Sequence, residues 1–416
     1  MRFIFLCFVL LVSAGFNEAK RTRVISKWRL TAIANKLFAH RLFMEVARTT
    51  PEQENFFISP YAVSAGLSMT LYGAHSTTAR EIMDTLGYTQ LSTKRKSVIH
   101  YVFTRFYTHC KMLHQVHQKD HGFELTSVNR MFGESRNIFV PSYVKGVEHF
   151  YGAKLKKVPF RRNPERARQE INTWVEEVTN GTIREALPPN SVTAETLLVL
   201  MSTLYFKGLW EKPFEINLRS TFYTTNNEQY QTDFVQQTMF ALHSFSEQFQ
   251  AHIVELPFKT SSSRYKMVMQ LILPESRGAD NLNLIEDQFD EENFDFATED
   301  QENISVTIRL PKFRLEYETD LKETLYNMGI QSLFSRGEAD LSGISTNGDL
   351  SLGSAHHKTF IQVDESGTTA GASYAQGGFR SVSDLDLVFN HPFIVIIREK
   401  YTQMPMFMGR VARPMY

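Results

Sequence analysis

Residues 364–392 read DESGTTAGASYAQGGFRSVSDLDLVFNHP, and this stretch decides how the chain is interpreted. From residue 366 to 378 it contains four Gly, three Ala, two Thr and two Ser, and only Tyr374 and Gln376 are larger. Such a segment has too little apolar bulk to form a core, and its composition alone favours a flexible linker. It has no proline, however, so it can enter a β-ladder with small residues on both faces. Small residues on both faces suit a strand that slips between two existing strands.

A strand-forming run follows directly, from Leu387 to Ile397, and decides against a linker. Together with ESGTTAGAS at 365–373, it resembles the reactive loop and C-terminal signature of the serpins. The same resemblance covers NFFISP at 55–60, NTWV at 172–175, LYFKGLW at 204–210, LPKF at 310–313, ADLSGI at 339–344 and MFMGRV at 406–411. These motifs keep the family's order and spacing from about residue 30 to 414. The chain is therefore identified as a member of the serpins, of the secreted inhibitory type and of the kind found in arthropods.

The hydrophobic patterns predict an α+β protein, with helices mainly in the first half and strands mainly in the second. Expected helices cover 30–48, 62–72, 77–86, 97–116, 143–150, 166–179 and 321–328, and expected strands include 123–132, 197–206 and 359–363. The resemblance implies the serpin fold, with three β-sheets, eight to nine α-helices and an exposed reactive-centre loop at about 365–386. One sheet of that fold has five strands and can accept a sixth. No linker divides the chain, so residues 20–416 are expected to form a single domain.

The N-terminus predicts secretion. Residues 1–14 have a charged start, an apolar run of about ten residues and a small-residue end, as in a signal peptide. Cleavage is expected near Ala14, with Ala19 as the alternative. It removes Cys7 and leaves Cys110 without an intrachain partner. Two Asn-x-Ser/Thr sequons, at Asn180 and Asn303, are then candidate glycosylation sites in an extracellular glycoprotein.

The resemblance implies that the loop is offered to a protease as a substrate. After acylation, the freed loop would insert into the five-stranded sheet and carry the protease with it. The hinge that inserts first would consist of Gly367, Thr368, Thr369, Ala370, Gly371, Ala372 and Ser373. Tyr374 departs from the small or threonine residue usual at its position, and its packing during insertion would raise the fraction of loop that is cleaved as ordinary substrate.

The scissile bond determines which protease is inhibited. The family's count of residues from Glu365 places it at Ser381-Val382, which suits an elastase-like protease. A count one residue shorter places it at Arg380-Ser381, and arginine fits the acidic pocket of a trypsin-like protease. We favour Arg380-Ser381, and Phe379 would suit a chymotrypsin-like enzyme. The alternatives to a trypsin-like target are an elastase-like or cysteine protease, or a non-inhibitory serpin that acts as a carrier or chaperone.

Two polar clusters of the family are matched to different extents. Glu365 and Lys312 match an ion pair at the top of the sheet, where insertion begins, with Trp210 beside it. Lower down, the family closes the sheet with two serines, an asparagine and a histidine. Ser59 and His357 match this cluster, but Ala62 and Ser202 replace its second serine and its asparagine. The depleted cluster predicts either a water-filled gap or a sheet that opens easily.

Nothing else in the sequence competes with this interpretation. Lys plus Arg equals Asp plus Glu at 45 each, so neither nucleic acid nor an anionic membrane is expected as a partner. No nucleophile, zinc-protease or phosphate-loop motif suggests an enzyme. We therefore expect a monomer without metal or cofactor, whose partner is an extracellular serine protease bound covalently.

Two weaker patterns remain. Cys110, His114, His117 and His121 could line one helix face, but four ligands on one helix cannot surround a zinc ion tetrahedrally. A heparin-like glycosaminoglycan is a possible partner through two basic clusters, and in both a solvated face is the better reading. The clusters are Lys94, Arg95 and Lys96, and Lys154, Lys156, Lys157, Arg161, Arg162, Arg166 and Arg168.

Overall fold

The computed structural model of the chain describes residues 34–90, 99–101, 104, 108, 122–260, 262, 266–288, 301–367 and 385–416. The expected signal peptide, Cys110 and most of the expected reactive-centre loop lie outside these ranges. The strands, helices and contacts given below all belong to the described residues.

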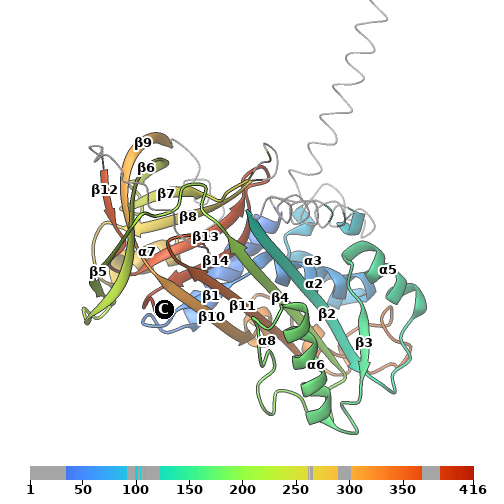
Figure 1. The fold of residues 1–416 in the computed structure, drawn as a ribbon. Coiled ribbons are helices and arrows are strands. Elements are labelled where there is room, and N and C mark those ends of the chain that lie inside the picture. Colours follow the sequence, from blue (N-terminus) through green and yellow to red (C-terminus); the bar gives the residue numbers. More distant parts are fainter. Residues whose placement is uncertain are drawn as a thin grey trace, which may run out of the picture.

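A five-stranded sheet runs diagonally through the centre of the molecule (Figure 1). Its strands, in spatial order, are β10 (Phe313–Asp320), β11 (Ser354–Val363), β4 (Leu198–Gly208), β2 (Phe123–Glu134) and β3 (Leu155–Val158). β4 and β11 are buried on both faces. For β4, this agrees with the apolar run at 197–206 from which a buried strand was predicted. These two central strands are parallel to each other, whereas β10 and β2 pair with them in the antiparallel sense.

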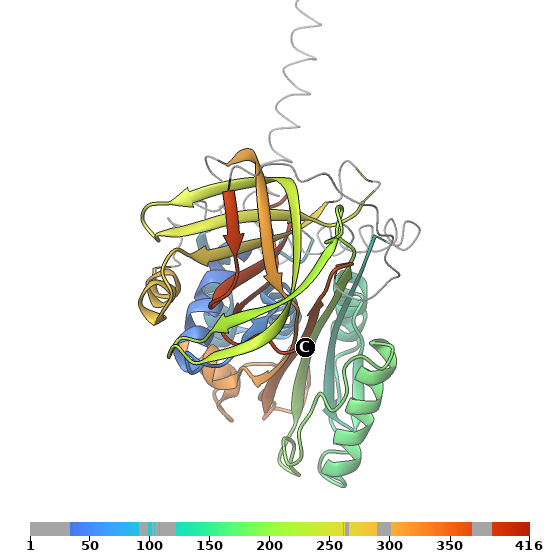
Figure 2. The same cartoon turned by 60° about the vertical axis from the view of Figure 1, so that its left-hand side comes forward.

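A nine-stranded sheet lies beside it, in the order β1-β14-β13-β8-β7-β6-β9-β12, with β5 paired to β6. Its strands are β1 (Phe56–Ile58), β5 (Ile216–Tyr223), β6 (Gln229–Ser246), β7 (Ala251–Pro257), β8 (Met267–Pro274), β9 (Glu302–Pro311), β12 (Leu385–Val388), β13 (Phe393–Glu399) and β14 (Met404–Val411). With 18 residues, β6 pairs with β5 and β9 along its first part and with β7 at its end (Figure 2). Two of the three expected sheets therefore share β6 and form one hydrogen-bonded ladder.

The helices cover the sheets, and α2 and α6 (Pro164–Val178) begin at side-chain caps. α2 (Pro60–Gly73) is buried nearly all round, as its apolar sequence predicts. The Ser59 side chain accepts a hydrogen bond from the Ala62 amide, and Pro60 occupies the first turn. The others are α3 (Ser76–Thr85), α5 (Pro141–Tyr151), α6 (Pro164–Val178), α7 (Ala279–Asp287) and α8 (Lys322–Asn327), the single-turn helices η1 (Tyr88–Gln90) and η3 (Ser332–Phe334), and helical residues at 34–49, 99–101, 104 and 108.

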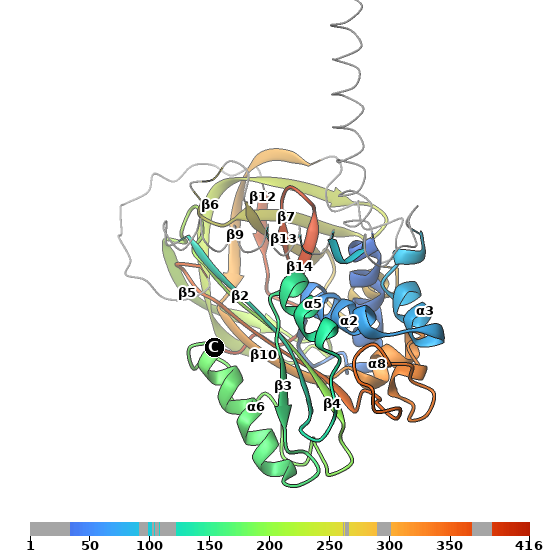
Figure 3. The same cartoon turned by 90° about the vertical axis from the view of Figure 1, so that its right-hand side faces the viewer.

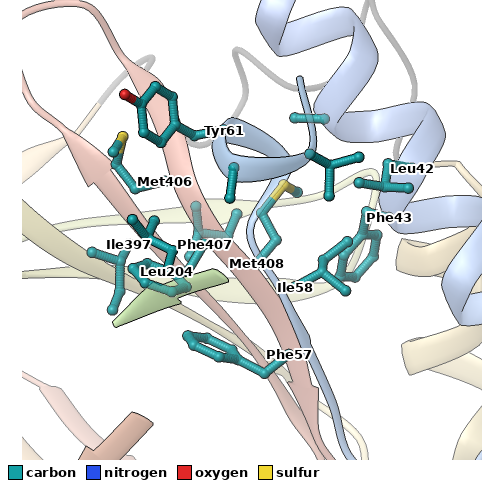
Figure 4. Packing of buried hydrophobic residues seen from close by; sticks show 14 of the residues in the cluster. Leu42, Phe43, Phe57, Ile58, Tyr61, Leu204, Ile397, Met406, Phe407 and Met408 are labelled. Atoms are coloured by element: carbon teal, nitrogen blue, oxygen red, sulfur yellow. The ribbon is translucent and has the colours of Figure 1, made fainter. Parts of the chain in front are cut away.

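Two cores occupy the two faces of the five-stranded sheet. In the larger one, the rings of Phe57 and Phe407 stack with centroids 5.0 Å apart, close to Leu204 of β4 (Figure 4). α6 runs along the opposite face of the sheet (Figure 3). There it covers a second cluster, which includes Met201 of β4 and Phe360 of β11. Because side chains alternate along a strand, even-numbered residues of β4 face the larger core and odd-numbered residues face α6.

The α+β class and the serpin architecture are confirmed, and so are the buried helix at 62–72 and the strand at 123–132. The strand expected at 359–363 begins five residues earlier, at Ser354. The prediction missed its first half because a histidine pair and a lysine interrupt the apolar pattern there. Helix α7 and the short β1 and β3 were not predicted, since short elements with mixed composition give no clear period.

Candidate functional site

The described chain stops at Gly367 and resumes at Leu385, and both ends of the intervening segment are fixed. Gly367 forms an antiparallel bridge with Leu209, and Leu385 begins β12, which pairs in parallel with β9. The segment therefore leaves the five-stranded sheet at one end and joins the nine-stranded sheet at the other. Outside the described residues lie the predicted hinge residues, Tyr374 and the candidate scissile bonds: Thr368, Thr369, Ala370, Gly371, Ala372, Ser373, Tyr374, Phe379, Arg380, Ser381 and Val382.

The boundary between β4 and β11 is where the resemblance places an inserted strand. Its parallel ladder runs from the pair Ser354–Val199 to the pair Phe360–Tyr205 and goes no further, although both strands continue. Parallel pairing is slightly less stable per residue than antiparallel pairing. The other two central pairings of the sheet, β10–β11 and β2–β4, are antiparallel. We call this parallel boundary between β4 and β11 the seam.

The residues 364–367, here named the loop base, close the open end of this seam. The backbone amide of Trp210 donates to the carbonyl of Ser366 at 3.0 Å, and that of Phe214 donates to the carbonyl of Glu365 at 2.9 Å. Trp210 Nε1 donates to the carbonyl of Asp364 at 3.1 Å, and the indole stacks on Phe258 with centroids 4.9 Å apart. Trp210 therefore anchors the loop base through its backbone, its ring nitrogen and its stacking face.

The ion pair matched from the family is present at the same place. Lys312 Nζ lies 2.6 Å from Glu365 Oε2, and the two side chains are 16% and 30% exposed. The hydrogen bond from Lys312 lowers the pKa of Glu365, against the opposing effect of partial burial. Burial raises the pKa of the neighbouring Asp364, whose Oδ1 accepts the amides of Ser366 and Gly367. Because both side chains remain partly exposed to solvent, the pair's own contribution to stability is about 1 kcal/mol or less.

His357 of β11 joins three elements lower in the seam. Its Nδ1 lies 2.8 Å from the carbonyl oxygen of Ser202 in β4, and its Nε2 lies 2.9 Å from the amide nitrogen of Ser59 at the start of α2. A carbonyl only accepts and an amide N–H only donates, so Nδ1 carries the proton and Nε2 is the acceptor. Burial lowers the pKa of His357 to about 4, although the bond to the Ser202 carbonyl opposes this shift. The imidazole is therefore neutral at physiological pH.

The depleted cluster is closed by backbone groups. Ser59 and Ser202 bind His357 through their main chain, while the Ser202 hydroxyl has no hydrogen-bond partner among the described residues. That hydroxyl points toward α2, where an added Cβ on Gly66 would lie 2.6 Å from it. Thr359, two residues further along the same face of β11, donates to the carbonyl of Phe57. This contact was not predicted, and the spacing of Thr359 from His357 is the one feature of the sequence that points to it.

The two sequons and the second basic cluster lie in the described part of the chain. Asn180 and Asn303 are exposed, the first in the turn after α6 and the second on β9, as a glycosylation site requires. In the second basic cluster, Lys154, Lys156, Arg166 and Arg168 form ion pairs with neighbouring glutamates. This pairing lowers the net positive charge available to a glycosaminoglycan. The first basic cluster and the side chains of Cys110, His114, His117 and His121 lie outside the described residues.

Within the described part of the chain, no helix is long and apolar enough to cross a membrane. Nor do three or more His, Cys, Asp or Glu side chains in that part already lie close enough together to hold a metal ion.

Comparison with known proteins identifies the family. The family model described as "Serpin (serine protease inhibitor)" matches residues 33–414. The chain belongs to the serpin family. Antithrombin-III of Mus musculus is 33% identical over 405 residues, covering 95% of this chain and 83% of that protein. The leukocyte elastase inhibitor of Xenopus tropicalis is also 33% identical, covering 86% of this chain and 93% of its own.

Among solved structures, uncleaved ovalbumin is similar to this serpin with a TM-score of 0.80. The two sequences are 27% identical, and the match covers 92% of this chain and 100% of ovalbumin. The two relatives named above come from vertebrates, so the arthropod kind remains a prediction. The family is shown, whereas the target protease and the inhibitory behaviour of this member remain to be proposed.

Proposed function

We propose that this serpin is a secreted, monomeric inhibitor of extracellular trypsin-like serine proteases and that each molecule acts once. The serine oxygen of the protease attacks the carbonyl carbon of Arg380, forming an ester and releasing the amino group of Ser381. The loop ahead of Arg380 then inserts between β4 and β11. The observation that carries the proposal is the seam itself: two parallel central strands whose open end is closed by the base of the loop.

The dimensions fit this insertion. About thirteen residues separate Gly367 from the proposed bond, and at roughly 3.3 Å each they span about 43 Å. β4 has 11 residues, which by the same rise measures about 36 Å. The freed segment is therefore long enough to pair along the whole of β4. Most of its side chains are small, which favours entry into a boundary whose two strands are buried on both faces.

A non-inhibitory carrier or chaperone is the second candidate, and Tyr374 is the observation that favours it. In the alternation from Thr368, Tyr374 falls on the face that Thr368 occupies, so a large ring has to be accommodated during insertion. Slow insertion gives the protease time to hydrolyse the ester, and the serpin is then consumed as a substrate. The next experiment separates the two candidates.

Incubation with trypsin is expected to give a band at the summed mass of serpin and protease after boiling in detergent. An ester that insertion has trapped survives denaturation, whereas a non-inhibitory serpin gives only cleaved chain. In the Thr368→Arg variant the band should disappear while cleavage continues, because an unpaired arginine cannot be buried at the first inserting position. Ser383→Arg is the matched control, since Ser383 lies beyond the proposed bond and does not insert. Cleavage without a band for every protease tried, including elastase, contradicts inhibition.

The Arg380→Ala variant is expected to lose inhibition of trypsin-like proteases and to keep or gain inhibition of elastase-like ones. Removing one partner of a buried charge pair costs roughly 2–5 kcal/mol, so the rate of complex formation with trypsin should fall about thirtyfold or more. Rates are measured with both proteases, and mass spectrometry identifies the released C-terminal peptide. A peptide that begins at Val382 after reaction with trypsin rules out the bond proposed here.

Expression in cultured animal cells is expected to deliver the serpin to the medium without residues 1–14. Glycosidase treatment should remove two glycans and lower the mass accordingly. The variants Asn180→Gln and Asn303→Gln should each lose one of these two mass differences. N-terminal sequencing locates the cleavage, with a start after Ala19 as the alternative. A chain that stays in the cells and begins at Met1 contradicts secretion.

A further inference from the structure

A pair of histidines on the nine-stranded sheet plays no part in the proposed inhibition. His243 lies on β6 and His252 on β7, which are side by side in the upper part of Figure 1. His243 Nε2 is 3.0 Å from His252 Nδ1, and the ring centroids are 5.3 Å apart. Both residues are only partly buried, so the pair can be reached from solvent.

Two carboxylates continue the row on either side of the imidazoles. Glu302 of β9 is directly opposite His243 in the β6–β9 ladder, so the two side chains are on the same face. Glu275, just after β8, is close enough to His252 for its charge to act on that ring. Both glutamates are exposed, and within the described part of the chain neither forms an ion pair. Four side chains from consecutive strands thus follow the order Glu302, His243, His252, Glu275.

We propose that His243 and His252, with Glu302 or Glu275, bind a divalent transition-metal ion such as Zn²⁺. Zinc bonds to imidazole nitrogens are about 2.0–2.1 Å long, so a tetrahedral site holds two such nitrogens about 3.3 Å apart. The two ring nitrogens are hydrogen-bonded at 3.0 Å, close to this separation. To bind the ion, the shared proton moves to the other nitrogen of its ring, and both rings turn so that their two lone pairs converge on the metal. Imidazole and carboxylate are ligands that suit zinc, copper and nickel.

The hydrogen bond between the two rings suits a metal ligand. A ring nitrogen binds a metal only when it carries no proton. One of the two nitrogens already accepts the hydrogen bond, so that imidazole has a lone pair directed at its partner. The third ligand has to come from a carboxylate that turns toward the pair, because no three such side chains among the described residues are gathered already. An exposed glutamate that forms no ion pair there can make this turn at little cost.

With Glu302 as the third ligand, the metal would join β9, β6 and β7 where β6 passes from one half of the nine-stranded sheet to the other. With Glu275, it would join β6 and β7 to the end of β8. An ion that binds the folded chain and not the unfolded one raises the melting temperature by mass action. Zn²⁺ should therefore raise the melting temperature in a saturable way, whereas Mg²⁺ and Ca²⁺ should not, since they prefer sites built from oxygen ligands alone.

The test is titration of the full chain with Zn²⁺, followed by calorimetry and thermal melting, and with Co²⁺, followed by its visible absorption. His243→Ala and His252→Ala are each expected to weaken binding about tenfold to a hundredfold and to remove the four-coordinate cobalt bands. Glu302→Gln and Glu275→Gln show which carboxylate takes part, and the larger loss identifies the ligand. His149→Ala is the matched control, because His149 is exposed on α5, away from this row.

Metal that the His243→Ala/His252→Ala double variant retains in full belongs to other side chains, such as the stripe at 110–121, and overturns the proposal. So does the absence of any melting shift in the parent chain at 100-fold excess of Zn²⁺. Melting without metal, compared between parent and variants, separates loss of a ligand from loss of folding.

Discussion

A Gly367→Ala variant is expected to melt at a lower temperature than the parent serpin and to pass faster into polymers or a loop-inserted form. Gly367 has φ +140°, a backbone conformation that residues with a side chain rarely adopt. A Cβ at this position would lie 2.1 Å from the Gly208 carbonyl oxygen and 2.6 Å from Leu209 Cα. Both are backbone atoms, so the clash cannot be relieved by turning a side chain.

The expected loss in the free energy of unfolding is large for the addition of one methyl group. A residue held in such a region of φ costs roughly 1–3 kcal/mol even before the contact with Gly208 is considered. The contact also opposes the Leu209–Gly367 bridge and the hydrogen bond from the Trp210 amide to Ser366, which hold the loop base. Loss of the loop base opens the seam between β4 and β11 at the end where insertion starts.

Thermal melting beside native gel electrophoresis measures both effects. Gly348→Ala is the matched control, because Gly348 has no unusual φ and a Cβ there meets nothing within 4 Å. If Gly367→Ala melts with the parent and forms polymers no faster, the loop base does not hold the seam closed.

Sequence patterns predicted one side-chain contact of this site and one central strand of the fold. Lys312 and Glu365 were paired from the family pattern, and the structure places their charged atoms 2.6 Å apart. The apolar run at 197–206 predicted a strand buried on both faces, which β4 is. Both predictions succeed because they depend on the side chains themselves, and the sequence specifies each side chain.

Interactions that the backbone makes, or that depend on strand register, could not be predicted from the sequence. The polar cluster looked depleted because Ala62 and Ser202 lack the expected side chains, yet His357 is held by an amide and a carbonyl that every sequence possesses. The His243–His252 contact depends on how β6 is paired with β7, which no local pattern specifies. β6 also pairs with strands in both halves of the nine-stranded sheet. An alternating sequence pattern predicts a strand but not the number of strands that pair with it.

Lowering the pH from about 6.5 to 4 is expected to destabilise the native serpin through His357. In the unfolded chain this imidazole takes up a proton near pH 6.5, whereas burial in the folded chain lowers its pKa to about 4. Between these values the unfolded state binds more protons, so the free energy of unfolding falls as the pH falls. The stabilisation is complete above pH 6.5, and the difference of about 2.5 pH units corresponds to roughly 3 kcal/mol lost by pH 4.

The structural consequence follows from the same two bonds. Protonation of Nε2 would set a donor against the Ser59 amide, which is itself a donor, and would break the contact between β11 and the start of α2. The seam would then loosen in its middle and admit the reactive loop or that of another molecule. We therefore expect polymers to form faster at pH 4.5 than at pH 7.5, at a temperature where the neutral protein is stable.

Melting curves and native gels across this range measure both effects in the parent, in His357→Gln and in the exposed control His149→Gln. Other buried histidines, His356 and His391, also have pKa values lowered by burial and contribute a common slope. The difference between parent and His357→Gln isolates the single residue: the variant is less stable at pH 7.5, and its stability depends less on pH below 6.5. His149→Gln should follow the parent. If His357→Gln keeps the full slope of the parent, the seam is not governed by this imidazole, and another group accounts for acid sensitivity.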